Sequence, residues 1–89
     1  MRKLSEKNFS YVNPDKIYVF ILGGSVYKAQ AMLSETQGFS FASLNHTHCF
    51  ASGVWDNIYD MILDAVHICK KQNGKVYELN NIIDLFKVL

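Results

Sequence analysis

The stretch FILGGSVYKAQ, residues 20–30, joins an apolar run to two glycines and a serine that could begin a helix. A helix N-terminus after a glycine turn can bind phosphate, because its free backbone N–H groups point at the anion. Lys28 stands where a P-loop and a dinucleotide fingerprint each need their last glycine. We therefore expect a tight strand-to-helix corner. An alternative hypothesis places a nucleotide-like small ligand at Gly23, Gly24, Ser25 and Lys28.

Histidine and cysteine gather in the segment His46-Thr47-His48-Cys49, and a second cysteine follows at Cys69. A structural zinc site needs four such ligands at recognised spacings, and the sequence shows no such set. His48 and Cys49 would point to opposite faces of a strand, which argues against a Cys–His catalytic pair. We expect no metal, no cofactor and no catalytic residue.

Carboxylates recur every four residues at Asp56, Asp60 and Asp64, on the polar side of a helix expected over 55–72. A carboxylate cluster can bind a divalent cation or transfer protons. The same spacing describes an ordinary solvated helix face, or an acidic ridge that meets a basic partner. We expect the solvated face and predict that the protein is not an enzyme.

The composition indicates one small folded domain over residues 1–89. Hydrophobic residues make up 49% of the chain and charged residues 19%, and 89 residues are too few for two independent cores. The net charge of +1 creates no general attraction to nucleic acid or to an anionic membrane. No segment has the length and apolar character of a membrane span or a signal peptide. We expect a cytoplasmic protein with reduced cysteines.

The expected elements are strands over 9–12, 17–22, 39–44, 48–53 and 75–79, and helices over 25–35, 55–72 and from Asn80 or Asn81 onward. Pro14 suits the second position of a β-turn between the first two strands. From residue 17 to residue 79 the order is β-α-β-β-α-β, which predicts a ferredoxin-like α+β fold. An extra N-terminal strand and a C-terminal helix flank it. Residues 17–22 are apolar on both faces, so we place them centrally in the sheet.

The last two helices carry more apolar side chains than one buried stripe needs. Met61, Ala65 and Ile68 lie beside the main stripe of the helix over 55–72, and Ile82 and Phe86 lie on the C-terminal helix. We expect these five residues to form an interface with a protein partner or a second copy, most simply as a dimer. The leading prediction is a non-enzymatic interaction module that binds and modulates a macromolecule, like a bacterial or phage inhibitor or antitoxin.

Two parts of the sequence resemble parts of known families. Residues 17–22 and 37–44 resemble the two aromatic strand motifs of RNA-recognition motifs, in which aromatic side chains stack on bases. The resemblance implies that Tyr18 and either Phe39 or Phe41 stack on RNA or single-stranded DNA. The order of elements departs from that family, because a further strand precedes the second helix.

Residues 49–58 and the helix after them resemble the strand-to-helix step of HicB-type antitoxins. The helix expected after Gly23 departs from the order of that family, so membership does not follow. As a predicted partner, a nucleic acid is therefore less favoured than a protein.

Overall fold

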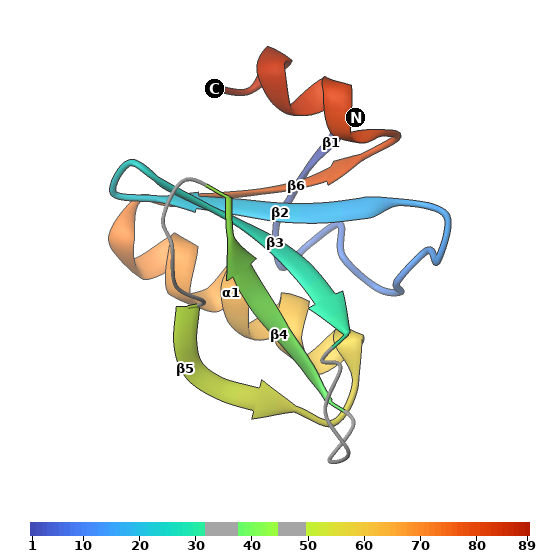
Figure 1. Ribbon diagram of the computed structural model, residues 1–89, viewed down its shortest axis with the longest axis vertical. Helices are drawn as coiled ribbons and strands as arrows, with labels where there is room; N and C mark the ends of the chain where they lie inside the picture. Colours follow the sequence, from blue (N-terminus) through green and yellow to red (C-terminus); the bar gives the residue numbers. More distant parts are fainter. Residues whose placement is uncertain (32–37, 45–49) are drawn as a thin grey trace.

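Antiparallel strands make up most of the structure, a computed structural model that describes residues 1–31, 38–44 and 50–89. The strands are β1 (Arg2–Leu4), β2 (Ile17–Leu22), β3 (Ser25–Ala31), β4 (Phe39–Ser43), β5 (Phe50–Trp55) and β6 (Lys75–Leu79). The described residues also form an α-helix, α1 (Ile58–Gln72), and a short 3-10 helix, η1 (Ile82–Lys87) (Figure 1). This arrangement confirms a small α+β protein.

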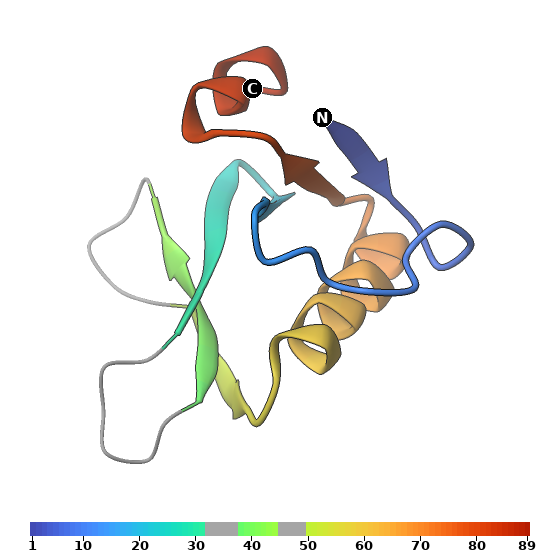
Figure 2. The same cartoon turned by 90° about the vertical axis from the view of Figure 1, so that its right-hand side faces the viewer.

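Strands β2 to β5 pair in sequence order, and β6 returns after α1 to pair with β2. The three-residue β1 extends the sheet at the outer side of β6, so the spatial order is β1-β6-β2-β3-β4-β5. Strand β2 is thus an interior strand, as its apolar sequence predicts. Figure 2 shows α1 against one side of the curved sheet, with η1 beyond the end of β6 and beside the N-terminus.

The predicted helix over 25–35 is wrong in its described part, because Ser25–Ala31 form β3. Gly23 and Gly24 have positive φ angles of 56° and 84° and close a hairpin between β2 and β3. Two-residue hairpin loops favour glycine because both central residues take up this left-handed backbone. The Gly-Gly pair is therefore a hairpin loop between two strands, and the exact ferredoxin-like order is not confirmed.

The core lies between α1 and the face of the sheet that it covers. Helix α1 contributes Met61, Ile62, Ala65, Val66 and Cys69, all buried. The ring of Phe20 lies at the centre of the facing strands, with its centroid 4.5 Å from that of Phe41 and 4.7 Å from that of Tyr27. Strand alternation places Val19 and Leu79 on the opposite face, where they are buried as well.

The chain ends differ in part from expectation. The predicted strand over 9–12 is wrong, because β1 supplies the extra N-terminal strand and the segment after it has no regular structure. The turn at Pro14 is confirmed by a 3.1 Å hydrogen bond from the Lys16 N–H to the Asn13 carbonyl. Among the described residues, no helix combines the length and the apolar character needed to cross a bilayer.

Candidate functional site

The glycine corner has no helix N-terminus to offer an anion. Ser25 pairs with Leu22 at the end of the hairpin, and Lys28 pairs with Val19 within the sheet. Both glycines are exposed, and a Cβ added at either one would meet no other atom within 4 Å. The helix-end ligand site predicted at Gly23, Gly24, Ser25 and Lys28 therefore loses its structural basis.

The aromatic residues proposed to stack on bases lie inside the molecule. Tyr18 and Phe41 are buried in the core that α1 covers, and Phe39 is half-buried against the same core. A nucleic acid would have to displace α1 to reach these rings. The prediction of base stacking on this sheet face is therefore wrong, and the covering helix is the physical reason.

The predicted interface divides into two parts with different outcomes. Met61 and Ala65 are buried in the core, so their assignment to an interface is wrong. Ile68 is half-buried on α1, whereas Ile82 and Phe86 on η1 are exposed. The sequence pattern placed Met61 and Ala65 at the edge of the apolar face of α1. In the structure the buried side of α1 is instead centred on Met61, Ile62 and Ala65.

The other chemical groupings give no site in the described structure. The indole N–H of Trp55 donates a 2.6 Å hydrogen bond to Asp64, and Asp60 exchanges hydrogen bonds with the N-cap residue Asn57. Asp56, Asp60 and Asp64 are all exposed, in line with the expected solvated face of α1. No metal-ligand cluster occurs among the described residues, and His46, His48 and Cys49 lie outside them.

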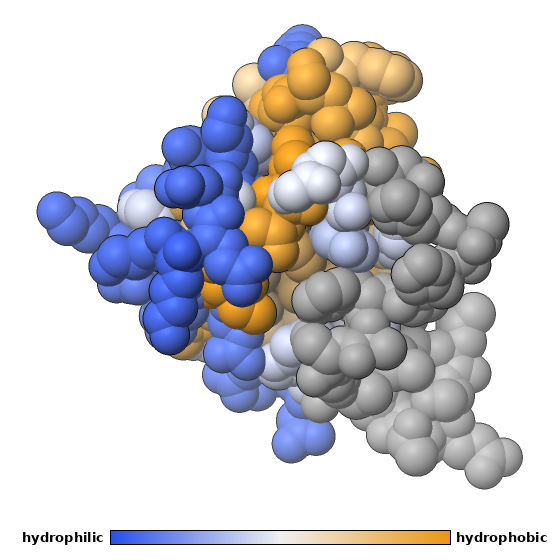
Figure 3. Space-filling view, turned by 90° about the vertical axis from the view of Figure 1, so that its left-hand side faces the viewer, coloured by the Kyte–Doolittle hydropathy of each residue, from blue (hydrophilic) through white to orange (hydrophobic). Residues whose placement is uncertain are grey.

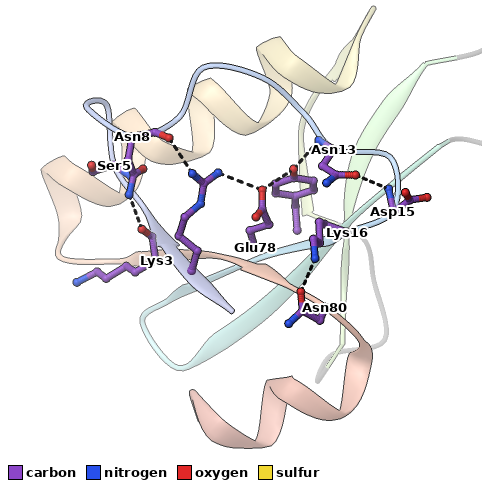
Figure 4. Close-up of polar contacts among 10 residues, drawn as sticks. Lys3, Ser5, Asn8, Asn13, Asp15, Lys16, Glu78 and Asn80 are labelled. Carbon is purple, nitrogen blue, oxygen red and sulfur yellow. Dashed lines mark hydrogen bonds and ion pairs between the residues drawn. The ribbon is translucent and has the colours of Figure 1, made fainter.

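A row of polar side chains crosses β1, β6 and β2 and fixes the N-terminal segment (Figure 4). Glu78 Oε2 accepts hydrogen bonds from Arg2 at 3.1 Å and from the Tyr18 hydroxyl at 2.8 Å. The Asn13 N–H donates to the Tyr18 hydroxyl oxygen at 2.8 Å, and Arg2 also donates to the Asn8 carbonyl at 3.2 Å. The row therefore joins the first strand and the loop before β2 to the sheet.

Burial determines the chemistry of this row. Desolvation raises the pKa of Tyr18 from 10.0 to about 12, with a further contribution from Glu78, while the Asn13 N–H acts in the opposite direction. The hydroxyl is therefore protonated at neutral pH and donates to a carboxylate already paired with Arg2. A carboxylate already paired with a guanidinium and a hydroxyl suits a structural role better than proton transfer.

The C-terminal apolar surface, which we define as Ile82, Ile83, Phe86 and Leu89, is the least covered hydrophobic part of the described structure. These side chains are 45%, 67%, 79% and 66% exposed, respectively. Figure 3 shows hydrophobic residues gathered over the C-terminal end and continuing as a band down the middle of that side. The N-terminus lies beside η1 in Figures 1 and 2, and the exposed Met1 adds to this end of the molecule.

Local hydrogen bonds hold η1 in shape without covering its apolar side. The Asn81 side chain accepts from the Ile83 N–H at 2.9 Å, and Asp84 accepts from the Asn80 and Asn81 N–H groups at 3.1 and 3.3 Å. This reciprocal capping box replaces the hydrogen bonds that a helix start otherwise lacks. Helix η1 contacts β6, the strand directly before it, and Asp84 is its buried residue.

The charges of η1 neutralise each other. Lys87 Nζ lies 3.3 Å from Asp84 Oδ1. Burial acts to raise the pKa of Asp84, but hydrogen bonds from the Asn81 and Asn80 backbone and from Lys87 outweigh it and lower that pKa. The carboxylate is therefore ionised and paired at neutral pH. The C-terminal apolar surface consequently has no unpaired charge of its own helix beside it.

Sequence reasoning placed Ile82 and Phe86 at an interface but missed Ile83. It assumed α-helical spacing, whereas η1 has the tighter 3-10 winding, in which residues three apart lie on one side. The spacing Ile83, Phe86 and Leu89 fits that period, so the signal was present in the sequence.

Comparison of the chain with protein families, with curated proteins and with solved structures finds no match. The candidate function therefore depends on the geometry alone.

Proposed function

We propose that this protein is a non-enzymatic interaction module that self-associates through the C-terminal apolar surface and modulates a macromolecular partner, as inhibitor- or antitoxin-like proteins do. The observation that supports it is the exposure of Ile82, Ile83 and Phe86 on one short, capped helix and of Leu89 just beyond its C-cap. Exposed apolar side chains gathered in one patch typically mark a site of contact with another macromolecule.

A second copy of the chain is the occupant that this surface fits best. In a two-fold dimer each side chain lies against the same patch of the other copy, so a like-charged patch would repel itself. The only charges on η1, Asp84 and Lys87, form an ion pair with each other. An apolar surface whose helix charges are paired can therefore lie against its own copy without repulsion between like charges of η1.

The chemistry of the described residues supports a non-enzymatic role. Burial raises the pKa of the Cys69 thiol to about 11, so it is protonated and weakly nucleophilic at neutral pH. His67 lies 3.6 Å from Glu6, and both side chains are substantially exposed. An exposed pair of this kind lacks the enclosed setting in which catalytic groups act.

The test is native mass spectrometry and analytical ultracentrifugation of the chain and of two variants. Phe86→Glu places a charge in the C-terminal apolar surface, and Tyr11→Glu makes the same kind of change at an exposed aromatic residue outside it. We expect the parent chain and Tyr11→Glu to form multiples of the 10.2 kDa subunit, and Phe86→Glu to be monomeric. A parent chain that remains monomeric at all concentrations would refute self-association.

A further inference from the structure

A pocket of about 380 Å³ lies between the segment that follows β1 and the C-terminal end of α1. Residues 3–7 form one wall, and the other consists of residues between Val66 and Asn73 on α1 together with Gly74–Val76. Its volume falls within the range of about 300–1,000 Å³ that is usual for small-molecule sites. None of its lining residues belongs to the C-terminal apolar surface, so the two features are separate.

The charges that line this pocket are strongly unbalanced. They come from four lysines, Lys3, Lys7, Lys70 and Lys75, and one carboxylate, Glu6. The lining therefore carries a net charge of +3, whereas the whole chain carries only +1, so the rest of the chain is net negative. Residues 3–7 and 70–75 lie near opposite ends of the sequence, and the fold brings their positive charges to one place.

Three of the four lysines carry a positive charge that no described carboxylate neutralises. Glu6 lies 3.4 Å from Lys70 Nζ, so its charge is already engaged. Lys3, Lys7 and Lys75 form no ion pair with any other described residue. In Figure 4 the Lys3 side chain extends away from Glu78. The C-terminal end of α1 adds a partial negative charge of about half a unit, which is small against a net +3.

Apolar groups form the floor of the pocket. Leu4, Val66, Cys69 and Val76 line it, and all four are buried. The Cys69 thiol is uncharged at neutral pH, because burial raises its pKa to about 11. A Cβ at Gly74 would come within 2.6 Å of Cys69 Sγ and 2.9 Å of the Ile21 carbonyl oxygen, so the close packing here depends on glycine.

We propose that this pocket, the lysine pocket, binds a small organic anion. A phosphate or carboxylate group of the ligand contacts the lysines that lack an ion pair, and an apolar body lies on the buried floor. A bare inorganic anion leaves the floor uncovered, and a neutral apolar molecule leaves the lysines without a counter-charge. The ligand site is independent of the self-association proposed above.

The test uses four matched probes: phenyl phosphate, benzoate, inorganic phosphate and benzyl alcohol. Each is titrated at low ionic strength into the full ¹⁵N-labelled chain, and backbone amide shifts are followed. We expect phenyl phosphate or benzoate to shift the amides of residues 4–7 and 74–76 with saturation, and to bind more tightly than the other two probes. Whichever of phenyl phosphate and benzoate binds more tightly identifies the charged group that the pocket prefers. Absence of saturation with both, or shifts confined to η1, would overturn the proposal.

Single lysine variants distinguish binding of the anion in the pocket from a general attraction to the positive charge of the protein. Lys75→Gln removes one charge from the lining, and Lys71→Gln removes one charge from the same end of α1 outside the lining. We expect Lys75→Gln to weaken the aromatic anion by about fivefold and Lys71→Gln by about twofold or less. Lys75→Arg should preserve binding. Equal weakening by both glutamine variants would overturn the proposal, as would binding of a single-stranded oligonucleotide without binding of either aromatic anion.

Discussion

The hydroxyl of Tyr18 donates a 2.8 Å hydrogen bond to Glu78 Oε2, linking two residues that are 60 positions apart and directly opposite each other on β2 and β6. The same carboxylate oxygen accepts from Arg2 on β1, which is opposite Glu78 on the other side. One partly buried carboxylate thus connects three neighbouring strands. The N-terminal segment, which has little regular structure, is held to the sheet through this contact.

Removing the Tyr18 hydroxyl should destabilise the fold. In Tyr18→Phe the ring still packs in the core, but Glu78 loses a donor and the Asn13 N–H loses its acceptor. We expect the free energy of unfolding in urea to fall by about 1–3 kcal/mol. Tyr59→Phe is the control, because its ring stacks on Phe9 and its hydroxyl has no hydrogen-bond partner among the described residues. An equal loss in both variants would contradict a role for the polar row.

Alkaline pH should weaken the fold through Cys69 and Tyr18. Burial raises the pKa of Cys69 from 9.0 to about 11 and that of Tyr18 from 10.0 to about 12. Between the unfolded and folded values the unfolded chain has lost a proton that the folded chain keeps, so stability falls as pH rises. We expect this loss to begin near pH 9 and to continue to about pH 12.

The contribution of Tyr18 to this alkaline loss can be isolated. In Tyr18→Phe the pH dependence between pH 10 and about 12 should become shallower, while the part due to Cys69 remains. Urea denaturation of the parent chain and of Tyr18→Phe at a series of pH values measures both pH dependences. Identical pH profiles for the parent chain and the variant would show that Tyr18 titrates alike in the folded and unfolded states.

The hairpin between β2 and β3 should depend on the backbone of Gly23. Its φ of 56° suits glycine and strains most other residues, although a Cβ there would meet no atom within 4 Å. We expect Gly23→Ala to reduce the free energy of unfolding by about 1–2 kcal/mol. Gly23→Asn should cost clearly less, because asparagine tolerates this conformation in two-residue hairpin loops. Equal stability of the alanine variant and the parent chain would contradict the positive φ.

Acid should loosen η1 before it unfolds the sheet. The pKa of Asp84 is lowered from 3.8, so the stability that its carboxylate provides is present above that value and is lost as pH falls through the folded pKa. Amide hydrogen exchange of η1 relative to β2 measures this loosening. Asp84→Asn should loosen η1 at neutral pH and remove the acid dependence, whereas Asp56→Asn, at an exposed position before α1, should do neither.

Much of the secondary structure could be predicted because it has local causes. Residues 17–22 and 75–79 are strands as expected, since their apolar residues follow strand patterns. Helix α1 ends where Asn73, with a φ of 57°, and Gly74 interrupt it, as expected from the Asn-Gly pair. The helix predicted over 25–35 failed because Val26 and Ala29, three residues apart, fit one face of a helix, whereas in β3 they are buried on opposite faces of the sheet. Pairing with β2 and β4 then favours the strand.

The amino-acid sequence by itself determined the α+β class, the interior position of β2 and the limits of α1 within a few residues. It also narrowed the cap of η1 to Asn80 or Asn81, of which Asn81 is the cap. These features depend on composition, short-range periodicity and side chains that hydrogen-bond to nearby backbone. Only the tertiary structure decided which apolar residues are exposed, burying Met61 and leaving Phe86 uncovered. It also assembled the lysine pocket from residues 3–7 and 66–76. The burial of a side chain and the charge around it depend on segments that are distant in sequence. The packing of α1 and β1 against the sheet brings those segments together.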